Sequence, residues 1–314
     1  MANIIAEFCQ NHNGDFVLLK EMVHAAKESG ATHGKIQTIF SDDLTFRERF
    51  EEGKIINNKI VTLKRPYKAE YERLKKLDLS LENQLEFINI CEKINLIPLT
   101  TVFTWDSIEK VYNIGFKNIK VASYDCSSFP FLKKLKKYFD KIILSTGATY
   151  DHEIDRAYNI LNDHDFNFLH CVTIYPTPLN KMNLERINYL KKYSKPVGFS
   201  EHSLVKRDGI KASKVALWLG AEIIERHFTI LGEEDSKDGP VSINQKLLEE
   251  LSEFSKLDKE SMYDIIVDEI PDYEIMLGNK KRSLSDEELR NRDYYRGRFA
   301  SRDNKGEYRY NWEN

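Results

Sequence analysis

The sequence has 314 residues, of which 41% are hydrophobic, so one large domain with a full core is possible. Its 47 Lys and Arg residues nearly balance its 50 Asp and Glu residues, and this balance gives no reason to expect a nucleic-acid or membrane partner. The sequence lacks an apolar run of membrane-helix length and a secretion signal at its start, and its four cysteines are scattered without CxxC spacing. We therefore expect a cytosolic (cytoplasmic) protein whose thiols are reduced.

Short runs rich in β-branched residues alternate with amphipathic segments, such as Phe16–Ser29, Leu81–Ile94 and Asp151–Asn162. Eight strand–helix units in about 230 residues predict an α/β fold of the (β/α)₈ TIM-barrel type, since an open doubly wound sheet usually has fewer strands or a GxGxxG loop after the first. The eight predicted strands are Asn3–Cys9, His33–Ile39, Ile97–Phe103, Asn118–Ser123, Lys141–Gly147, Phe166–Val172, Pro196–His202 and Glu222–Phe228.

Two segments depart from the repeated pattern. Ser41–Ser80 is a long charged insertion, which we expect to lie above the carboxyl ends of the strands as part of a lid. The pattern stops near Lys256, and we predict a TIM-barrel catalytic domain over residues 1–257. A polar C-terminal extension without an independent core then covers 258–314, and its Arg- and Tyr-rich end is expected to dock on the barrel or on a neighbouring subunit.

Every predicted strand carries a charged or hydrogen-bonding residue in its second half, where the strands of a barrel converge on the active site. A packed interior would not tolerate these groups without partners. They are Glu7, Lys35 and Gln37, Thr100 and Thr101, Lys120 and Ser123, Ser145 and Thr146, His170, Ser200 and His202, and Glu225 and His227.

Lys35 and Lys120 lie in otherwise apolar strands. Each could extend its ammonium to the barrel rim. We favour a pocket for phosphate or carboxylate, because cations recur together with hydroxyl groups on separate strands. Those hydroxyls belong to Thr101, Ser123, Ser145 and Ser200.

His202 and His227 end neighbouring strands, so their imidazoles can reach one metal ion, although a single strand-end histidine is more often structural. Glu225 and Asp238 could complete that site or serve as acid–base groups. Cys171 is a poor candidate nucleophile, because adjacent strand residues such as His170 point to opposite faces.

The segment Asn11-His12-Asn13-Gly14-Asp15 follows the first strand. As a turn, it would place Gly14 in a left-handed conformation and Asp15 at the N-cap of the next helix. The turn alone does not account for two asparagines flanking a histidine, and Asn13 is a candidate substrate-binding residue at the barrel mouth.

Eight segments resemble, in order and spacing, the bacterial N-acetylneuraminate (sialic acid) synthase family over about residues 3–250. Together they are specific, although each alone is weak. They are Ile4-Ile5-Ala6-Glu7 with Asn11–Asp15, Lys35-Ile36-Gln37-Thr38, Lys120-Val121-Ala122-Ser123, Leu144–Gly147, His170-Cys171, Tyr175-Pro176-Thr177-Pro178, Gly198–Ser203 and Gly220–Thr229.

The resemblance implies that phosphoenolpyruvate condenses with an N-acetylated amino-sugar aldehyde, such as N-acetylmannosamine, to give a nonulosonic acid and phosphate. It implies a divalent metal ion, Mn²⁺ or Mg²⁺, held by His202 and His227. Glu225 and Glu7 are the candidate catalytic carboxylates. Phosphoenolpyruvate would bind Lys35, Thr101, Lys120, Ser123, Ser145 and Ser200, and the sugar would lie near Glu7, Tyr175 and Asp238.

Several alternatives stay open. The sugar could be a diacetamido-trideoxy hexose, as in legionaminic or pseudaminic acid synthases, and a related octulosonate-phosphate type is less favoured by the motifs. The chain could also be a non-catalytic barrel that binds a sugar or a partner. Family members usually have Asp where Glu201 stands. Many also end in an antifreeze-like domain whose arginine enters the partner subunit's site. We expect this chain to lack that full domain, with Arg296 or Arg298 as a substitute cation and a homodimer as the expected assembly.

Overall fold

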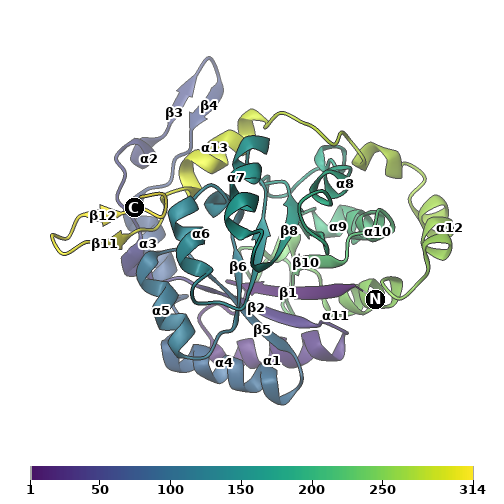
Figure 1. Cartoon of the computed structure of the whole chain (residues 1–314), viewed down its shortest axis with the longest axis horizontal. Coiled ribbons are helices and arrows are strands. Elements are labelled where there is room, and N and C mark those ends of the chain that lie inside the picture. Colours follow the sequence, from purple (N-terminus) through teal and green to yellow (C-terminus); the bar gives the residue numbers. More distant parts are fainter. Residues whose placement is uncertain (1, 314) are drawn as a thin grey trace.

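The computed structural model describes residues 2–313 and shows a closed barrel of eight parallel strands, in the spatial order β1-β10-β9-β8-β7-β6-β5-β2 (Figure 1). The predicted TIM barrel is therefore confirmed, and all eight predicted strands are present. Several end one or two residues earlier than predicted, so His202 and Ser123 lie just beyond their strands. The barrel strands are β1 (Asn3–Cys9), β2 (His33–Thr38), β5 (Ile97–Val102), β6 (Asn118–Val121), β7 (Lys141–Ser145), β8 (Asp165–Cys171), β9 (Gly198–Glu201) and β10 (Ile223–His227).

Helices surround the barrel, and their apolar faces form one large core against the outer surface of the strands. Among residues 2–313 no helix combines the length and the apolar character needed to cross a membrane. The helices are α1 (Phe16–Glu28), α2 (Arg49–Glu52), α3 (Tyr67–Lys75), α4 (Leu81–Lys93), α5 (Trp105–Asn113), α6 (Phe129–Leu135), α7 (Asp151–Leu161), α8 (Arg186–Leu190), α9 (Val205–Asp208), α10 (Lys211–Trp218), α11 (Gln245–Phe254), α12 (Lys259–Glu269) and α13 (Asp286–Tyr295).

The barrel interior is arranged in layers. An apolar floor consists of one buried side chain from each of five strands: Ile5, Leu99, Ile143, Leu169 and Ile223. Because side chains of a strand alternate between its two faces, residues two positions further along point into the same interior, one layer closer to the carboxyl ends. Those residues are Glu7, Thr101, Ser145, Cys171 and Glu225. The alternation therefore places a polar layer directly above a closed apolar floor.

The insertion and the C-terminal segment meet above this polar layer. The insertion contains α2, α3 and a small hairpin of β3 (Lys54–Ile56) and β4 (Lys59–Thr62), and the C-terminal segment contains α13 and a hairpin of β11 (Ser301–Arg302) and β12 (Tyr308–Arg309). Figure 1 shows the yellow C-terminal elements beside the insertion. The C-terminal segment was expected to dock on the barrel or on a neighbouring subunit, and in this structure it packs on the barrel of its own chain.

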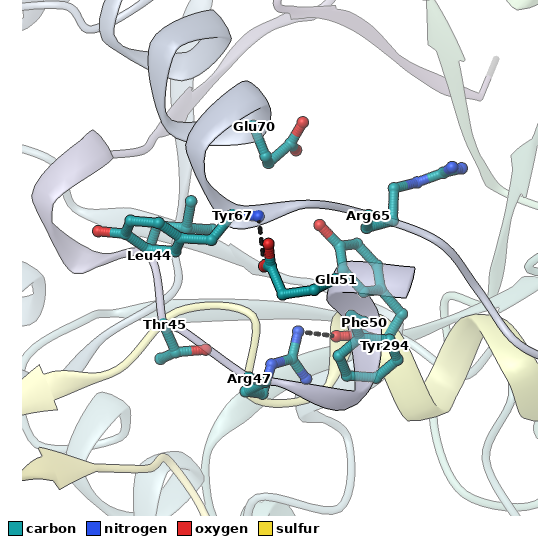
Figure 2. A pocket seen from close by; sticks show the side chains of 9 residues that line it. All are labelled: Leu44, Thr45, Arg47, Phe50, Glu51, Arg65, Tyr67, Glu70 and Tyr294. Carbon is teal, nitrogen blue, oxygen red and sulfur yellow. Dashed lines mark hydrogen bonds between the residues drawn. The ribbon is translucent and has the colours of Figure 1, made fainter. Parts of the chain in front are cut away.

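Arg47 joins these two segments, as Figure 2 shows for the small pocket at their junction. Its guanidinium lies 4.4 Å from the ring centre of Phe50 and donates to the backbone oxygen of Tyr294 at 2.7 Å. Nearby, the Glu51 carboxylate accepts a hydrogen bond from the backbone N–H of Tyr67 at the start of α3. The first part of the insertion therefore contacts α13 through Arg47 and α3 through Glu51.

The C-terminal segment also contacts the loops that follow four barrel strands. Asn291 donates to the carbonyl of Thr173, Arg292 to that of Ala148, and Asn311 to that of Phe103 and to the carboxylate of Asp125. Before this segment, α12 packs Met262 and Ile266 into the core around the barrel. The domain boundary at residue 257 stays a prediction.

The turn after β1 has the predicted conformation. Gly14 adopts φ +80°, and a Cβ there would lie 2.0 Å from the backbone oxygen of Lys76, so only glycine fits. Asp15 caps α1 by accepting from the backbone N–H of Val17 at 2.7 Å. The asparagines hold the loop after β10: Asn11 donates to the carbonyl of Phe228, and Asn13 to that of Asp235. The motif thus positions the loop that carries Asp238.

Candidate functional site

A cavity of about 340 Å³ opens at the carboxyl ends of the barrel strands, above the apolar floor. Its size is within the usual range for small-molecule sites. Strand ends supply its base, and the insertion, the loop after β10 and the C-terminal segment supply its rim. The lining residues are Glu7, Cys9, Gln10, Lys35, Gln37, Arg65, Arg73, Thr101, Phe103, Lys120, Ala122, Ser123, Tyr124, Ser145, Cys171, Tyr175, Ser200, His202, Glu225, His227, Lys237, Asp238, Tyr295 and Arg298.

The base of the cavity holds two lysines and two glutamates in alternation, each no more than 5% exposed. Lys35 forms an ion pair with Glu7 and lies 3.5 Å from a carboxylate oxygen of Glu225. The other Glu225 oxygen lies 3.2 Å from Lys120 Nζ. Four buried charges are tolerable only because each has an opposite neighbour. The alternative position of the lysines at the rim is therefore not observed, and both ammonium groups lie at the base of the cavity.

Burial and neighbouring charge act in opposite directions on this layer. Burial raises the pKa of Glu225, but the ammonium groups of Lys120 and Lys35 outweigh it and hold that pKa well below its usual value. Glu225 is therefore ionised at neutral pH and can accept a proton. Burial lowers the pKa of Lys35 to about 8, against the opposing effect of Glu225. Lys35 and Glu225 therefore both remain charged near neutral pH.

Hydroxyl groups surround the lysines. Lys120 Nζ donates to Ser145 Oγ at 2.7 Å, and Ser123 Oγ accepts from the backbone N–H of Gly147 at 3.0 Å. Thr101 and Ser200 also line the cavity and are buried. The lysine–hydroxyl grouping predicted from the strand ends is thus brought together in one place, where it can donate several hydrogen bonds to an anion.

His202 and His227 lie side by side, with ring centres 5.3 Å apart. Burial lowers the pKa of both imidazoles, so both are neutral and available as metal ligands. His227 also has Cys9 and Asp238 beside it: one ligand atom from each of the three lies within 4.8 Å of the others. His202 instead has Cys171 Sγ at 3.9 Å from its Nδ1. The predicted histidine pair is adjacent, and metal binding there stays a prediction.

The rim of the cavity is rich in cations. Arg65 and Arg73 come from the insertion, Lys237 from the loop after β10, and Arg298 from the C-terminal segment. Arg73 and Arg298 both pair with Glu70, which lies just outside the lining. Counted over the whole lining, six basic side chains face three carboxylates, so the cavity favours an anionic ligand.

Twelve of the thirteen residues predicted for the site line this cavity, and the exception is Asn13. Its exposed side chain is held by the loop after β10, and the structure does not bring it into the cavity. Arg298 lines the cavity as a candidate cation, whereas Arg296 does not and stacks on Trp312. The catalytic, binding and metal roles of these residues stay predictions.

Several lining residues are not among those predicted from the sequence. Arg73 and Lys237 lie on a helix and a loop, where no strand alternation marks the inward face. Tyr124 and Tyr295 stack on each other, with ring centres 5.0 Å apart. The two residues are far apart in the sequence, and no sequence pattern indicates that they meet. Cys9 had a usable signal, because it follows Ile5 and Glu7 on the inward face of β1.

Glu201 and His170 belong to the outer face of the barrel. Glu201 forms a fully buried ion pair with Arg226 and accepts a hydrogen bond from Ser213 on α10. His170 lies 2.7 Å from the carbonyl of Met182 and stacks on Phe199. Glu201 therefore joins β9 to α10 and lies outside the cavity lining. Cys171 does face the cavity, but burial raises its pKa to about 11, which keeps it a thiol.

The fold and the cavity define the chain as a (β/α)₈-barrel protein whose strand ends form a site suited to a small anion. Residues 22–264 match the family model described as NeuB family, and the chain belongs to this family. The family predicted from the sequence motifs is therefore confirmed.

The chain is similar to proteins named as synthases of related sugar acids. It is 34% identical to N,N′-diacetyllegionaminic acid synthase of Campylobacter jejuni over 79% of this chain and 73% of that protein. It is 29% identical to human N-acetylneuraminate-9-phosphate synthase, over 79% and 67% of the two chains. The crystal structure of the N-acetylneuraminic acid synthetase of Leptospira borgpetersenii in complex with citrate superposes with a TM-score of 0.70 at 28% identity, covering 93% of this chain and 90% of that one.

Proposed function

We propose that this protein is a cytosolic enzyme that condenses phosphoenolpyruvate with an N-acetylated amino-sugar aldehyde, giving a nonulosonic acid and inorganic phosphate. The observation that carries the proposal is the buried lysine–hydroxyl layer at the base of a cavity with an excess of cationic side chains. Phosphoenolpyruvate carries both a phosphate and a carboxylate; the lysines and hydroxyls of this layer can donate hydrogen bonds to them, and the cationic rim can compensate their charge. Four free, buried cysteines support the cytosolic location.

The proposed reaction forms one carbon–carbon bond, between the methylene carbon of phosphoenolpyruvate and the aldehyde carbon of the sugar. The aldehyde oxygen gains a proton and becomes a hydroxyl. Water adds to the carbon that carries the phosphate and loses one proton, which leaves a hydroxyl on that carbon. When the bond between this carbon and the phosphate oxygen breaks, the hydroxyl becomes the ketone and its proton leaves with the phosphate. The first proton lost by water balances the one gained by the aldehyde oxygen, so a single carboxylate between the two reacting centres can serve both steps.

Glu225 is the first candidate for that carboxylate. It is ionised and buried, and it lies between the two lysines that we assign to phosphoenolpyruvate. Glu7, paired with Lys35 on the same side of the layer, is the second candidate. Lys35, Lys120 and the hydroxyls would orient the phosphate and the carboxylate. Tyr175 and Asp238, nearer the rim, would contact the sugar.

The site fits a divalent metal ion. His202 and His227 are adjacent, buried and neutral, and Nδ1 of His227 has no hydrogen-bond partner within residues 2–313. When bound, a metal ion would act as a Lewis acid toward the aldehyde oxygen. We assign Mn²⁺ or Mg²⁺ to this position on the basis of the family, with His202 and His227 as its protein ligands.

Release of inorganic phosphate tests the proposal. Purified protein is supplied with Mn²⁺, phosphoenolpyruvate and one sugar at a time, and the product mass is measured. The panel contains N-acetylmannosamine and diacetamido-trideoxy hexoses, because the Campylobacter relative is named for a diacetylated product. At least one sugar should release phosphate and give the mass of the condensation product. If the metal is bound but no sugar releases phosphate, the protein is a non-catalytic binding barrel and the proposal fails.

Two lysines on neighbouring strands provide a matched pair for the anion pocket. Lys120 is buried at the base of the cavity, whereas Lys141 at the start of β7 is partly exposed and pairs with Asp165. Lys120→Ala should raise the KM for phosphoenolpyruvate at least about tenfold, since a charge-assisted contact contributes about 1.5–3 kcal/mol. Lys141→Ala should leave it unchanged. Equal KM values for the two variants would remove Lys120 from the pocket.

A further inference from the structure

The side chains around His227 form a group with ligand chemistry that the predicted histidine pair alone does not have. One ligand atom from each of Cys9, His227 and Asp238 lies within 4.8 Å of the others. These residues come from β1, β10 and the loop after β10, and β1 and β10 are hydrogen-bonded neighbours that bring Glu7 opposite His227. Cys9 and His227 are therefore held by the barrel strands, and Asp238 by the loop that Asn11 and Asn13 anchor.

The imidazole of His227 has a buried nitrogen that is free to bind a ligand. His227 is only 9% exposed, yet its Nδ1 has no hydrogen-bond partner among the described residues 2–313. A buried polar atom left without a partner is costly, so a group that binds this nitrogen gains stability from it. Cys9 and Asp238 each place one donor atom, a sulfur and a carboxylate oxygen, within 4.8 Å of a ring nitrogen of His227.

The nearby cations do not occupy this position. Arg73 is engaged elsewhere: its guanidinium donates to Gln10 at 2.7 Å and to both carboxylate oxygens of Glu70. Among the described residues Lys237 has no ion-pair partner within 4 Å, and Glu70 and Asp238 are the carboxylates near it. No described cation is therefore ion-paired with Asp238, and within the group the Cys9 thiol is a hydrogen-bond neighbour of Asp238.

We propose that Cys9 and Asp238 complete the metal site of His202 and His227, and that the Cys9 thiolate shifts the preference of this site away from Mg²⁺ toward a thiophilic divalent ion such as Zn²⁺, Co²⁺ or Fe²⁺. Thiolate, imidazole and carboxylate form the donor set of those ions, whereas Mg²⁺ prefers oxygen ligands alone. Ligand atoms around a tetrahedral ion lie about 3.5 Å apart, and the three donors lie within 4.8 Å of one another before any metal is bound. The thiol proton is released to solvent as the metal binds.

This inference rests on the proposed function: it adds Cys9 and Asp238 to the ligands His202 and His227 and favours a thiophilic ion over Mg²⁺, and it can be tested without any turnover. The protein is stripped with a chelator, and Co²⁺ is added in the absence of oxygen. Thiolate ligation of Co²⁺ gives an intense charge-transfer absorption in the near ultraviolet, which imidazole and carboxylate ligands do not give. We expect this absorption to rise to a plateau at one Co²⁺ per chain.

Two cysteines of the cavity provide the matched variants. Cys9→Ser should abolish the charge-transfer absorption and weaken Zn²⁺ binding at least about tenfold, while Mn²⁺ binding changes much less. Cys171→Ser should keep the absorption, because Cys171 lies beside His202 and outside the three-residue group. Cys9→Gly guards against misfolding: Cys9 adopts φ +45°, a conformation that glycine accepts without strain.

The outcomes separate the two proposals. Co²⁺ binding without the charge-transfer absorption, or an absorption that survives in Cys9→Ser and disappears in Cys171→Ser, would overturn the ligand assignment. Absence of any Co²⁺ or Zn²⁺ binding in the folded protein would overturn it as well. A normal absorption combined with no phosphate release from any sugar would leave the metal site intact and refute only the proposed synthase reaction.

Discussion

Arg47 offers a direct test of how the C-terminal segment is held over the cavity. The last carbonyl groups of a helix have no partner within the helix, and a cation there is favourable. Arg47 supplies that cation to α13: it donates to Tyr294 O at 2.7 Å and, at longer range, to Arg296 O at 3.3 Å. Its guanidinium also lies beside the rings of Phe50 and Tyr294, 4.4 Å and 5.2 Å from their centres (Figure 2). Burial lowers the pKa of Arg47 to about 10, so it remains charged at neutral pH.

The structure sets the size of the expected effect. One short hydrogen bond from a charged donor contributes about 2 kcal/mol, and partly buried cation–π contacts add about 1 kcal/mol. Arg47→Ala should therefore weaken the docking of α13 by about 3 kcal/mol, which corresponds to roughly a hundredfold increase in local opening. Arg49 is the matched control, because it reaches the same helix through Asp293 Oδ1 at 2.7 Å but its side chain is 58% exposed. An exposed pair of this kind contributes about 0.2–1 kcal/mol.

Hydrogen exchange read by mass spectrometry measures this difference directly. Amides of α13 should exchange about a hundredfold faster in Arg47→Ala and less than about fivefold faster in Arg49→Ala, while amides of the barrel strands keep their protection. Because Tyr295 and Arg298 line the cavity, the KM for the substrates should also rise in Arg47→Ala. Equal exchange of α13 in the two variants would refute the capping role. Loss of protection across the barrel would show that Arg47 stabilises the whole fold instead.

Three further changes test other parts of the structure. Glu225→Gln removes the carboxylate that two buried lysines share, so we expect a loss of about 3 kcal/mol in the free energy of unfolding and loss of phosphate release, with the exposed Glu222→Gln unchanged in both. Burial raises the pKa of Glu70, but the charges of Arg73 and Arg298 outweigh burial and lower that pKa to about 2. The ionised Glu70 therefore contributes its full stabilisation at a pH above the pKa it has in the unfolded chain, and this stabilisation is lost as the pH falls toward 2. In denaturant unfolding, the wild type should therefore lose up to about 2 kcal/mol more than Glu70→Gln between pH 6 and pH 3, and identical losses would contradict this. Finally, Glu201→Gln should lower the free energy of unfolding by about 3–5 kcal/mol, because it leaves Arg226 unpaired in the barrel wall. Its neighbour Ser200 lines the cavity, so Ser200→Ala should mainly raise the KM for phosphoenolpyruvate. The opposite pattern would place Glu201 on the inner face of the barrel and Ser200 on its outer face.

The fold and the base of the cavity were predictable because both follow from strand alternation. Each barrel strand is a short apolar run, and its period of two fixes which side chains face the interior once the strands are parallel. Glu7 follows Ile5, and Glu225 follows Ile223, so both carboxylates stand one layer above the apolar floor. The same rule separates Ser200, which lines the cavity, from its neighbour Glu201, which pairs with Arg226 in the wall.

The rim was not predictable in the same way, because its residues come from segments without a regular period. Arg73 lies on α3 of the insertion, and its inward direction depends on the contact with Glu70 and Gln10. Arg298 reaches the cavity only because α13 docks through Arg47 and Arg292. The contacts of Arg47 and Arg292 join residues more than 100 positions apart and leave no local pattern in the sequence. Asn13 illustrates the converse, since its motif position suggests a ligand contact while its side chain holds a loop.

The division between base and rim has a consequence for how an anion binds. At the base, two lysines and two glutamates balance each other, so this layer has no net charge of its own. The excess of positive charge comes from the insertion, the loop after β10 and the C-terminal segment. An anion that reaches the lysines must therefore either displace a glutamate from them or be attracted first by the rim. Because the rim cations Arg73 and Arg298 share the single partner Glu70, their positions depend on one another, and docking of the C-terminal segment is coupled to the charge that an incoming anion meets.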